Sequence, residues 1–283
     1  MNIKRLQSLA VLVLMLGTLS VQAASVIQLE IESSKNGEPA ARNTNIITID
    51  DNKVRLDYPG AETQKTATTP YLLTLNAGED WILANTKDNK FYCAKVDMNE
   101  FFRELGDIMW NMDNLTNPKF SDMKVELLVE EPGPEVLGYA TTHLRFQTTA
   151  RIKATVVFKK YEYGMVKTDD IWYAKDREIH PAKKRWIEAL THSGYEPIDQ
   201  LSSELRSKIP GSILKQDSVV KTTDYKKDKV DSYEQKVRVI SVKEVKSSEV
   251  AAGTFNKPDC KKISKSQTKD AAKALFTEGK FTL

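Results

Sequence analysis

Cysteine is scarce in this chain of 283 residues, which contains Cys93 and Cys260 and no other. Because the two lie far apart, the sequence has no Cys-x-x-Cys motif, and we do not expect catalytic use of a dithiol. In an oxidising compartment an isolated pair of cysteines is expected to form a disulfide bond. We therefore predict a Cys93–Cys260 disulfide; the alternative is two buried thiols that do not meet.

Histidine is almost as scarce, since only His143, His180 and His192 occur. None of them forms a His-x-x-x-His pair or a Cys/His spacing typical of a metal site. The sequence also lacks a Gly-x-Ser-x-Gly motif and a phosphate-binding glycine loop. We predict a protein that is not an enzyme and has no cofactor and no metal. A hydrolase whose catalytic residues meet from distant parts of the chain is the alternative.

A strong charge of either sign is also missing. The chain has 42 Lys and Arg against 39 Asp and Glu, a net charge of +3, so no overall basic field favours nucleic acid as a partner. Lysine and arginine alternate with valine over residues 235–245. On an outer strand, such residues keep a sheet edge soluble; binding to anionic lipid head groups or lipopolysaccharide is the alternative.

Long apolar runs are confined to the N-terminus. Lys4 and Arg5 precede an apolar run over residues 9–19, and small residues follow in Val21-Gln22-Ala23. This order is typical of a cleaved secretory signal peptide, here residues 1–23, and the run is short for a membrane anchor. We expect no transmembrane segment and a mature protein in the periplasm, with release into the medium as a second location and an uncleaved anchor as the alternative.

Short apolar segments separated by turn residues fill the next region. Ile47 and Ile49 precede Asp50-Asp51-Asn52, and Val54 and Leu56 follow it. A period of two places these side chains on one face of a β-hairpin, and Asp and Asn favour the turn. The same pattern predicts further neighbouring strands over residues 71–75, 81–84 and 91–96, which together form an antiparallel meander.

The period changes at Asp97, which can cap a helix with Glu100 three residues later. Apolar residues then recur with helical spacing, which predicts an amphipathic helix over residues 97–112 lying on the sheet. Ordinary core packing is one interpretation. The other is that the helix partly covers a cavity for an apolar ligand, because Phe and Met form an adaptable lining. The lining residues would be Trp81, Phe101, Phe102, Leu105, Met109 and Met112.

The rest of the chain is predicted to be mostly β structure. We expect Glu130-Glu131-Pro132-Gly133-Pro134 to end a strand, three further strands over residues 138–148, 152–161 and 165–175, and a turn at Gly164. Residues 181–209 should be helical, and residues 259–283 form a lysine-rich tail with a weak helix. The fold class is mainly β (α+β): one domain, residues 24–258, with a curved antiparallel sheet or half-barrel of about eleven strands and helices packed on one face.

Three segments carry a family resemblance. They are residues 51–57 (Asp-Asn-Lys-Val-Arg-Leu-Asp), 137–142 (Leu-Gly-Tyr-Ala-Thr-Thr) and 170–176 (Asp-Ile-Trp-Tyr-Ala-Lys-Asp). They resemble an uncharacterised bacterial secreted domain of the DUF4412 type, which is similar in shape to the periplasmic lipoprotein carriers LolA and LolB. The resemblance implies a curved sheet partly closed by helices, and a non-catalytic carrier for a lipid, acyl chain or lipoprotein. The alternative is a structural or interaction protein of the cell envelope with no ligand pocket.

Overall fold

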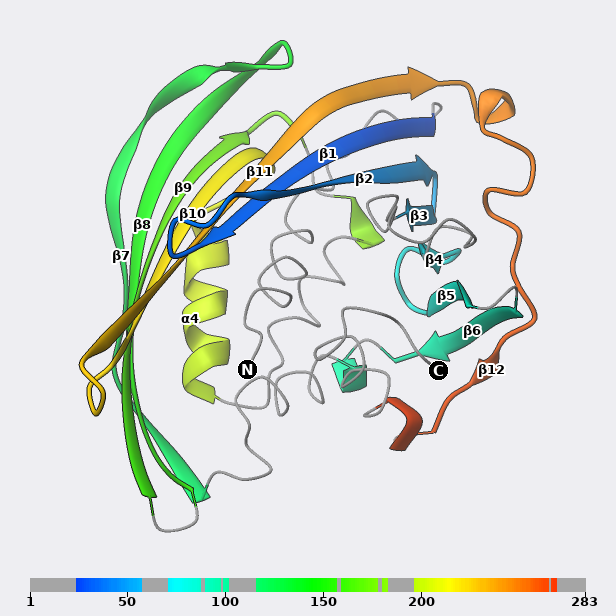
Figure 1. Ribbon diagram of the computed structural model, residues 1–283. Helices are drawn as coiled ribbons and strands as arrows, with labels where there is room; N and C mark the ends of the chain where they lie inside the picture. Colours follow the sequence, from blue (N-terminus) through cyan, green and yellow to red (C-terminus); the bar gives the residue numbers. More distant parts are fainter. Residues whose placement is uncertain are drawn as a thin grey trace.

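The computed structural model describes residues 24–57, 71–87, 90–97, 99–101, 116–156, 159–177, 180–182, 196–264 and 266–268. Within these residues one twelve-stranded sheet has the strand order β12-β6-β5-β4-β3-β2-β1-β11-β10-β9-β8-β7. The sheet curves strongly, and helix α4 (Glu196–Ser207) lies inside the curve beside its long strands (Figure 1). The predicted fold class, mainly β with a curved antiparallel sheet, is confirmed.

The strands are named in chain order. They are β1 (Ala24–Lys35), β2 (Ala41–Asp50), β3 (Lys53–Asp57), β4 (Tyr71–Thr74), β5 (Trp81–Lys87), β6 (Lys90–Val96), β7 (Thr116–Val136), β8 (Tyr139–Val156), β9 (Lys159–Ala174), β10 (Ser212–Asp224), β11 (Lys229–Val245) and β12 (Lys261–Lys262). A short 3-10 helix, η4 (Ser247–Glu249), follows β11. Every pairing is antiparallel except that of β12, which runs parallel to β6.

The short hairpins follow the local sequence signals closely. In the β2–β3 hairpin, Ile49 lies opposite Val54 and Ile47 opposite Leu56, so the apolar side chains share the inner face. Asp51 has a φ of 54°, the left-handed conformation that Asp tolerates in turns. The predicted hairpin is confirmed because period and turn chemistry both act within a few residues.

Strand β7 corrects the prediction that residues 130–134 end a strand. It continues through Pro132, which lies opposite Thr142, and ends at Val136. β7 is the last strand in the sheet order. Proline can occupy an edge strand because its missing N–H can lie on the side without a neighbouring strand. Gly133 also fits there, since a Cβ atom would come within 2.9 Å of the Trp172 ring.

Gly164 is a second correction, because it lies within β9 rather than in a turn. It is paired with Arg151 on one side and Thr223 on the other. A Cβ atom at this position would lie 2.5 Å from the Tyr225 hydroxyl. The glycine therefore permits the close approach of an aromatic ring, and the three strands predicted between residues 138 and 175 are two longer ones.

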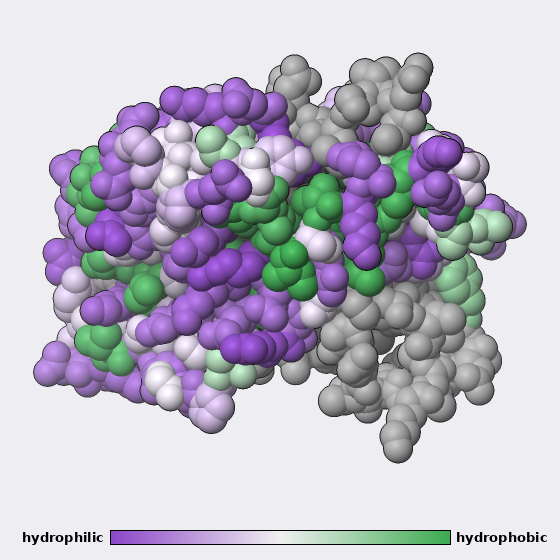
Figure 2. Space-filling model, turned by 90° about the horizontal axis from the view of Figure 1, so that it is seen from above, coloured by the Kyte–Doolittle hydropathy of each residue, from purple (hydrophilic) through white to green (hydrophobic). Residues whose placement is uncertain are grey.

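Apolar side chains pack on both faces of part of the sheet. The main core lies on the concave face and includes Leu72 and Leu83. On the opposite face, Leu73 and Ile82 form a second cluster with Cys260 and Phe255 of the C-terminal segment. Seen from above, hydrophilic residues cover most of the described surface and hydrophobic residues gather near its middle (Figure 2). The second cluster explains why β4 and β5 have apolar residues at successive positions.

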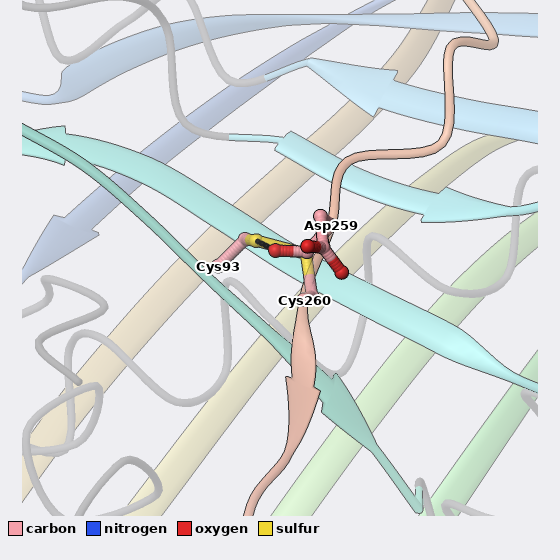
Figure 3. Close-up of a disulfide and its surroundings, with 3 residues drawn as sticks. All are labelled: Cys93, Asp259 and Cys260. Atoms are coloured by element: carbon pink, nitrogen blue, oxygen red, sulfur yellow. Dashed lines mark hydrogen bonds between the residues drawn. A yellow bond between two sulfur atoms is a disulfide. The ribbon is translucent and has the colours of Figure 1, made fainter.

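A disulfide bond holds the C-terminal segment against the sheet. It joins Cys93 of β6 to Cys260, beside Asp259 and next to β12 (Figure 3). Before this bond the segment passes over β3, where Arg55 Nη1 donates a hydrogen bond to the Thr254 carbonyl oxygen over 3.2 Å. The 24–258 domain therefore continues into a covalently attached segment that covers the second cluster.

The predicted helix at 97–112 is described at its beginning. Asp97 Oδ1 accepts hydrogen bonds from the backbone N–H groups of Asn99 and Glu100, over 2.9 and 3.2 Å, as an N-cap residue does. Residues 99–101 are helical, and residues 102–112 lie outside the described residues. Of the helical region predicted at 181–209, residues 181–182 and 196–209 are described; residues 181–182 are helical, and α4 ends at Ser207, two residues before the predicted end.

His180 connects the segment after β9 to the β2–β3 turn. Its Nε2 donates to the Asp51 carbonyl oxygen over 2.7 Å, and its Nδ1 accepts from the Ala182 N–H over 3.1 Å. This bonding pattern belongs to a neutral imidazole with the proton on Nε2. Burial lowers the pKa of His180 below its ordinary value of 6.5, and the bond to Asp51 opposes that shift.

We expect this histidine to make stability pH-dependent. Between the lowered folded pKa and 6.5, the unfolded chain binds more protons at this residue than the folded chain. The stabilising contribution of neutral His180 is therefore present above pH 6.5 and is lost as the pH falls below it. Urea unfolding of the wild type and His180→Gln at pH 7.5 and 5.5 measures this, and the wild type should lose more stability than the variant. Equal losses would contradict the prediction.

Candidate functional site

A cavity of about 170 Å³ lies between α4 and the long strands β7, β8 and β9. Its apolar lining includes Met123, Val125, Ala150, Met165, Leu201 and Leu205. The strand residues that line the cavity come in pairs two positions apart, such as Met123 and Val125 on β7, and so point to the same face of the sheet. Leu201 and Leu205 are four positions apart and share one face of α4. The cavity is therefore formed by a sheet face and a helix face that meet incompletely.

The sequence of α4 explains its position. Glu196 and Asp199 lie in its first turn and Arg206 in its last, which suits the helix dipole. Leu201 and Leu205 pack against the main core, whereas Ser203 and Glu204 are exposed. This amphipathic pattern directs one side of the helix toward the concave face and the other toward solvent.

One end of the cavity is polar. Lys167 of β9 lines it, and its Nζ lies 2.9 Å from Oδ2 of Asp169, whose side chain is fully buried. The other carboxylate oxygen, Oδ1, accepts hydrogen bonds from Ser218 Oγ over 2.6 Å and from Gln216 Nε2 over 3.1 Å. A buried carboxylate requires such partners because desolvation strongly disfavours its charge.

Asp169 belongs to a row of polar side chains across the concave face. Asp169 lies opposite Ser218, Ser218 opposite Gln235, and Gln235 opposite Ser33 on four successive strands. Residues directly opposite one another on neighbouring strands share a face. The row therefore lies next to the cavity residue Lys167 on β9, and the cavity itself adjoins the main core through Val125, Leu201 and Leu205.

The lining residues predicted from the sequence lie elsewhere or outside the described residues. Trp81 and Phe101 are 2% and 1% exposed and belong to the main core. Trp81 Nε1 donates a hydrogen bond to the Gly78 carbonyl oxygen over 3.1 Å. Phe102, Leu105, Met109 and Met112 are not among the described residues. Apolar residues at Met123 and Val125, two positions apart, predict that this face of β7 is buried. The same pattern occurs in strands that line a cavity and in strands that pack in a filled core, so it does not distinguish the two.

The outer face of the same strands carries a different cluster, centred on His143. Its ring nitrogens lie 2.9 Å from Glu131 Oε1 and 2.7 Å from Asp170 Oδ1, and the ring stacks on Trp172 at 4.6 Å. Arg145 donates to the same Asp170 oxygen, and this hydrogen bond raises the pKa of Arg145. In the described part of the chain, no hydroxyl or thiol bonds to the His143 ring. The cluster therefore connects β7, β8 and β9 on this face of the sheet.

Metal ligands and membrane-spanning helices are the next features of the described residues. No group of three or more His, Cys, Asp or Glu side chains among them is placed to hold a metal ion. In the same residues, no helix has both the length and the apolar character needed to span a membrane.

Comparisons with known proteins give distant structural likenesses. No protein-family model matches the chain, and no curated protein matches its sequence. One similar solved structure is PNGF-II, with 14% identity and a TM-score of 0.36 over 87% of this chain; the match spans 32% of PNGF-II. Another is the LolA superfamily protein NE2245 from Nitrosomonas europaea, with 8% identity and a TM-score of 0.27, covering 84% of this chain and 92% of that one. The resemblance to the DUF4412 type stays a prediction.

Proposed function

We propose that this protein is a non-catalytic binding or carrier protein of the bacterial cell envelope. Its ligand places an apolar segment, such as part of an acyl chain, in the cavity beneath α4. The observation that carries the proposal is a chamber of about 170 Å³ whose walls are mainly apolar side chains of β7, β8, β9 and α4. Ligand sites of this kind are concave and apolar, with a few polar groups that orient the ligand.

The volume limits what the cavity accepts. A dry, apolar cavity of about 150 Å³ is large enough to bind benzene, whereas sites for drug-sized ligands occupy about 300–1,000 Å³. The observed 170 Å³ therefore supports one segment of an acyl chain or a small apolar molecule. Lys167, paired with Asp169 at the polar end, supports a ligand with a polar group next to its apolar segment.

The disulfide supports the proposed location. Bonds such as Cys93–Cys260 persist in oxidising compartments and are rare in the cytosol. Together with the leader-like sequence of residues 1–23, this favours the periplasm, with the medium as the second location.

A matched pair of substitutions on α4 tests the cavity. Ser202 lines it, whereas its neighbour Ser203 is exposed. We expect Ser202→Phe to fill the chamber and to weaken binding of a fluorescent fatty acid by about tenfold or more, because the probe and the new ring compete for one volume. Ser203→Phe should bind the probe as the wild type does.

The measurement is a fluorescence titration of the full chain, with circular dichroism to verify that each variant is folded. Native mass spectrometry of protein purified from cells without delipidation provides a second readout, in which a copurified apolar molecule is expected. If the wild type binds no probe and carries no lipid, the protein is better described as a structural or interaction protein of the envelope. If Ser202→Phe binds the probe as well as Ser203→Phe does, the ligand site is not beneath α4.

A further inference from the structure

Arg177 is a buried cation three residues beyond the end of β9, ten residues along the chain from Lys167 in the cavity beneath α4. Its side chain is 4% exposed, and its guanidinium carbon lies 4.2 Å from the centre of the Tyr139 ring. Its backbone is held in place, because its carbonyl oxygen accepts a hydrogen bond from Ser212 Oγ over 3.3 Å. The aromatic face therefore covers one side of a guanidinium whose position is set by the surrounding strands.

The hydrogen-bonding groups of this guanidinium are not used. Nε and Nη2 are both buried, and neither has a hydrogen-bond partner. Buried polar atoms in folded proteins are almost always paired, and an arginine buried without an acceptor is costly. Arg151 also lies over a tyrosine, Tyr225, and its Nε likewise has no hydrogen bond of regular geometry, but that Nε lies 2.7 Å from Glu162 Oε1 in an ion pair.

The two unpaired atoms belong to the same edge of the guanidinium. Nε–H and one Nη2–H point in parallel from that edge, at the spacing of two oxygens of a carboxylate or phosphate. An anion that bound there would form two charge-assisted hydrogen bonds in a desolvated environment, where such bonds are strongest. The geometry therefore selects a ligand with two adjacent anionic oxygens rather than a neutral or cationic group.

Glu244 of β11 is an acidic residue that interacts electrostatically with Arg177. The pKa of Glu244 is raised by burial, while Arg177 and a hydrogen bond from Ser25 lower it. Among the described residues Glu244 and Arg177 form no ion pair, and Glu244 is itself exposed near the end of β11. Glu244 thus weakens the positive field of Arg177 without forming a hydrogen bond to Nε or Nη2.

We propose that Arg177, covered by Tyr139, is the anchor of an anion-binding site that takes a carboxylate or phosphate group through Nε and Nη2. The site is independent of the cavity beneath α4, since the two share no residue. Either a small free anion or the head group of an anionic lipid has this chemistry. Because Glu244 repels the bound anion, the site should bind more tightly when that charge is removed.

The test uses the full chain, inorganic phosphate as the probe and constant ionic strength. We expect phosphate to raise the melting temperature of the wild type and Arg177→Met to reduce phosphate affinity by about tenfold or more, because charge-assisted hydrogen bonds are lost. Without phosphate, Arg177→Met should melt at the same temperature as the wild type or higher, since an unpaired buried charge has been replaced by an apolar chain. Arg151→Met is the matched control and should keep the phosphate response.

Glu244→Gln gives a readout that a purely structural role would not change. We expect it to bind phosphate about two- to fivefold more tightly than the wild type. Cosedimentation with phosphatidylglycerol and phosphatidylcholine vesicles distinguishes the ligand sources: binding to phosphate alone assigns a small anion, and Arg177-dependent binding to the anionic vesicles assigns a lipid head group. The proposal is overturned if the wild type binds neither, if Arg177→Met keeps the wild-type response, or if Glu244→Gln leaves the affinity unchanged.

Discussion

The double variant Cys93→Ser/Cys260→Ser should lose about 3–5 kcal/mol of unfolding free energy, the largest change expected for any substitution considered for this chain. The disulfide joins residues 167 apart. Removing a cross-link of this length gives the unfolded chain much greater conformational freedom, and the cost rises with the logarithm of the loop length. The C-terminal segment also loses its attachment beside β6.

Urea unfolding monitored by tryptophan fluorescence measures this loss. The wild type in a reducing agent is the internal control and should unfold at the same urea concentration as the double variant. Hydrogen exchange should also become faster over residues 254–262, because Phe255 and Cys260 cover Leu73 and Ile82. A change below about 1 kcal/mol would contradict the chain-entropy argument.

Replacing Lys167 with methionine should lower the free energy of unfolding by about 3 kcal/mol, the second large effect. Asp169 is fully buried, and Lys167 Nζ is the cation 2.9 Å from its Oδ2. The hydrogen bonds from Ser218 and Gln216 remain in the variant, but the carboxylate loses its counter-charge in a poorly solvated interior. Breaking such a pair costs more than deleting both charges, because one buried charge stays uncompensated.

Two control variants distinguish the loss of the buried ion pair from the effect of replacing any lysine with methionine. Lys124 pairs with Glu126 on exposed β7, and Lys124→Met should cost less than about 1 kcal/mol because solvent screens the pair. The double variant Lys167→Met/Asp169→Asn should recover much of the stability lost in Lys167→Met. Chemical denaturation of the four proteins measures these differences, and no recovery in the double variant would show that the ion pair is not the cause.

The inward position of Asp169 could not be predicted from the sequence. In the segment 169–174 both alternate sets contain apolar side chains: Ile171 and Tyr173 share a face with Asp169, while Trp172 and Ala174 share one with Asp170. An acidic residue begins each set, so polarity does not indicate which face is buried. The pairing of Asp169 with Ser218 and of Ser218 with Gln235 supplies the buried partners, and these residues come from distant parts of the chain.

The cavity beneath α4 could not be predicted from the sequence either. The apolar spacing of α4 and the alternation in β7 predict that both elements bury a face. Whether these faces meet completely depends on the curvature of the sheet and the distance between helix and strands. The lining predicted at Trp81 and Phe101 was inferred from apolar residues at helical spacing beside the sheet, and in the structure both side chains belong to the main core.

Local sequence by itself determined the β2–β3 hairpin with its turn at Asp51, the cap at Asp97 and the mainly β fold class. These features depend on periodicity and turn conformation over a few neighbouring residues. The tertiary structure alone decided that β7 passes through Pro132, that Gly164 lies under Tyr225, that Asp169 is buried and that the Nε–Nη2 edge of Arg177 is unpaired. The reason is physical: edge position, close approach and burial are set by strands distant in the sequence, and their effects on free energy outweigh local preference.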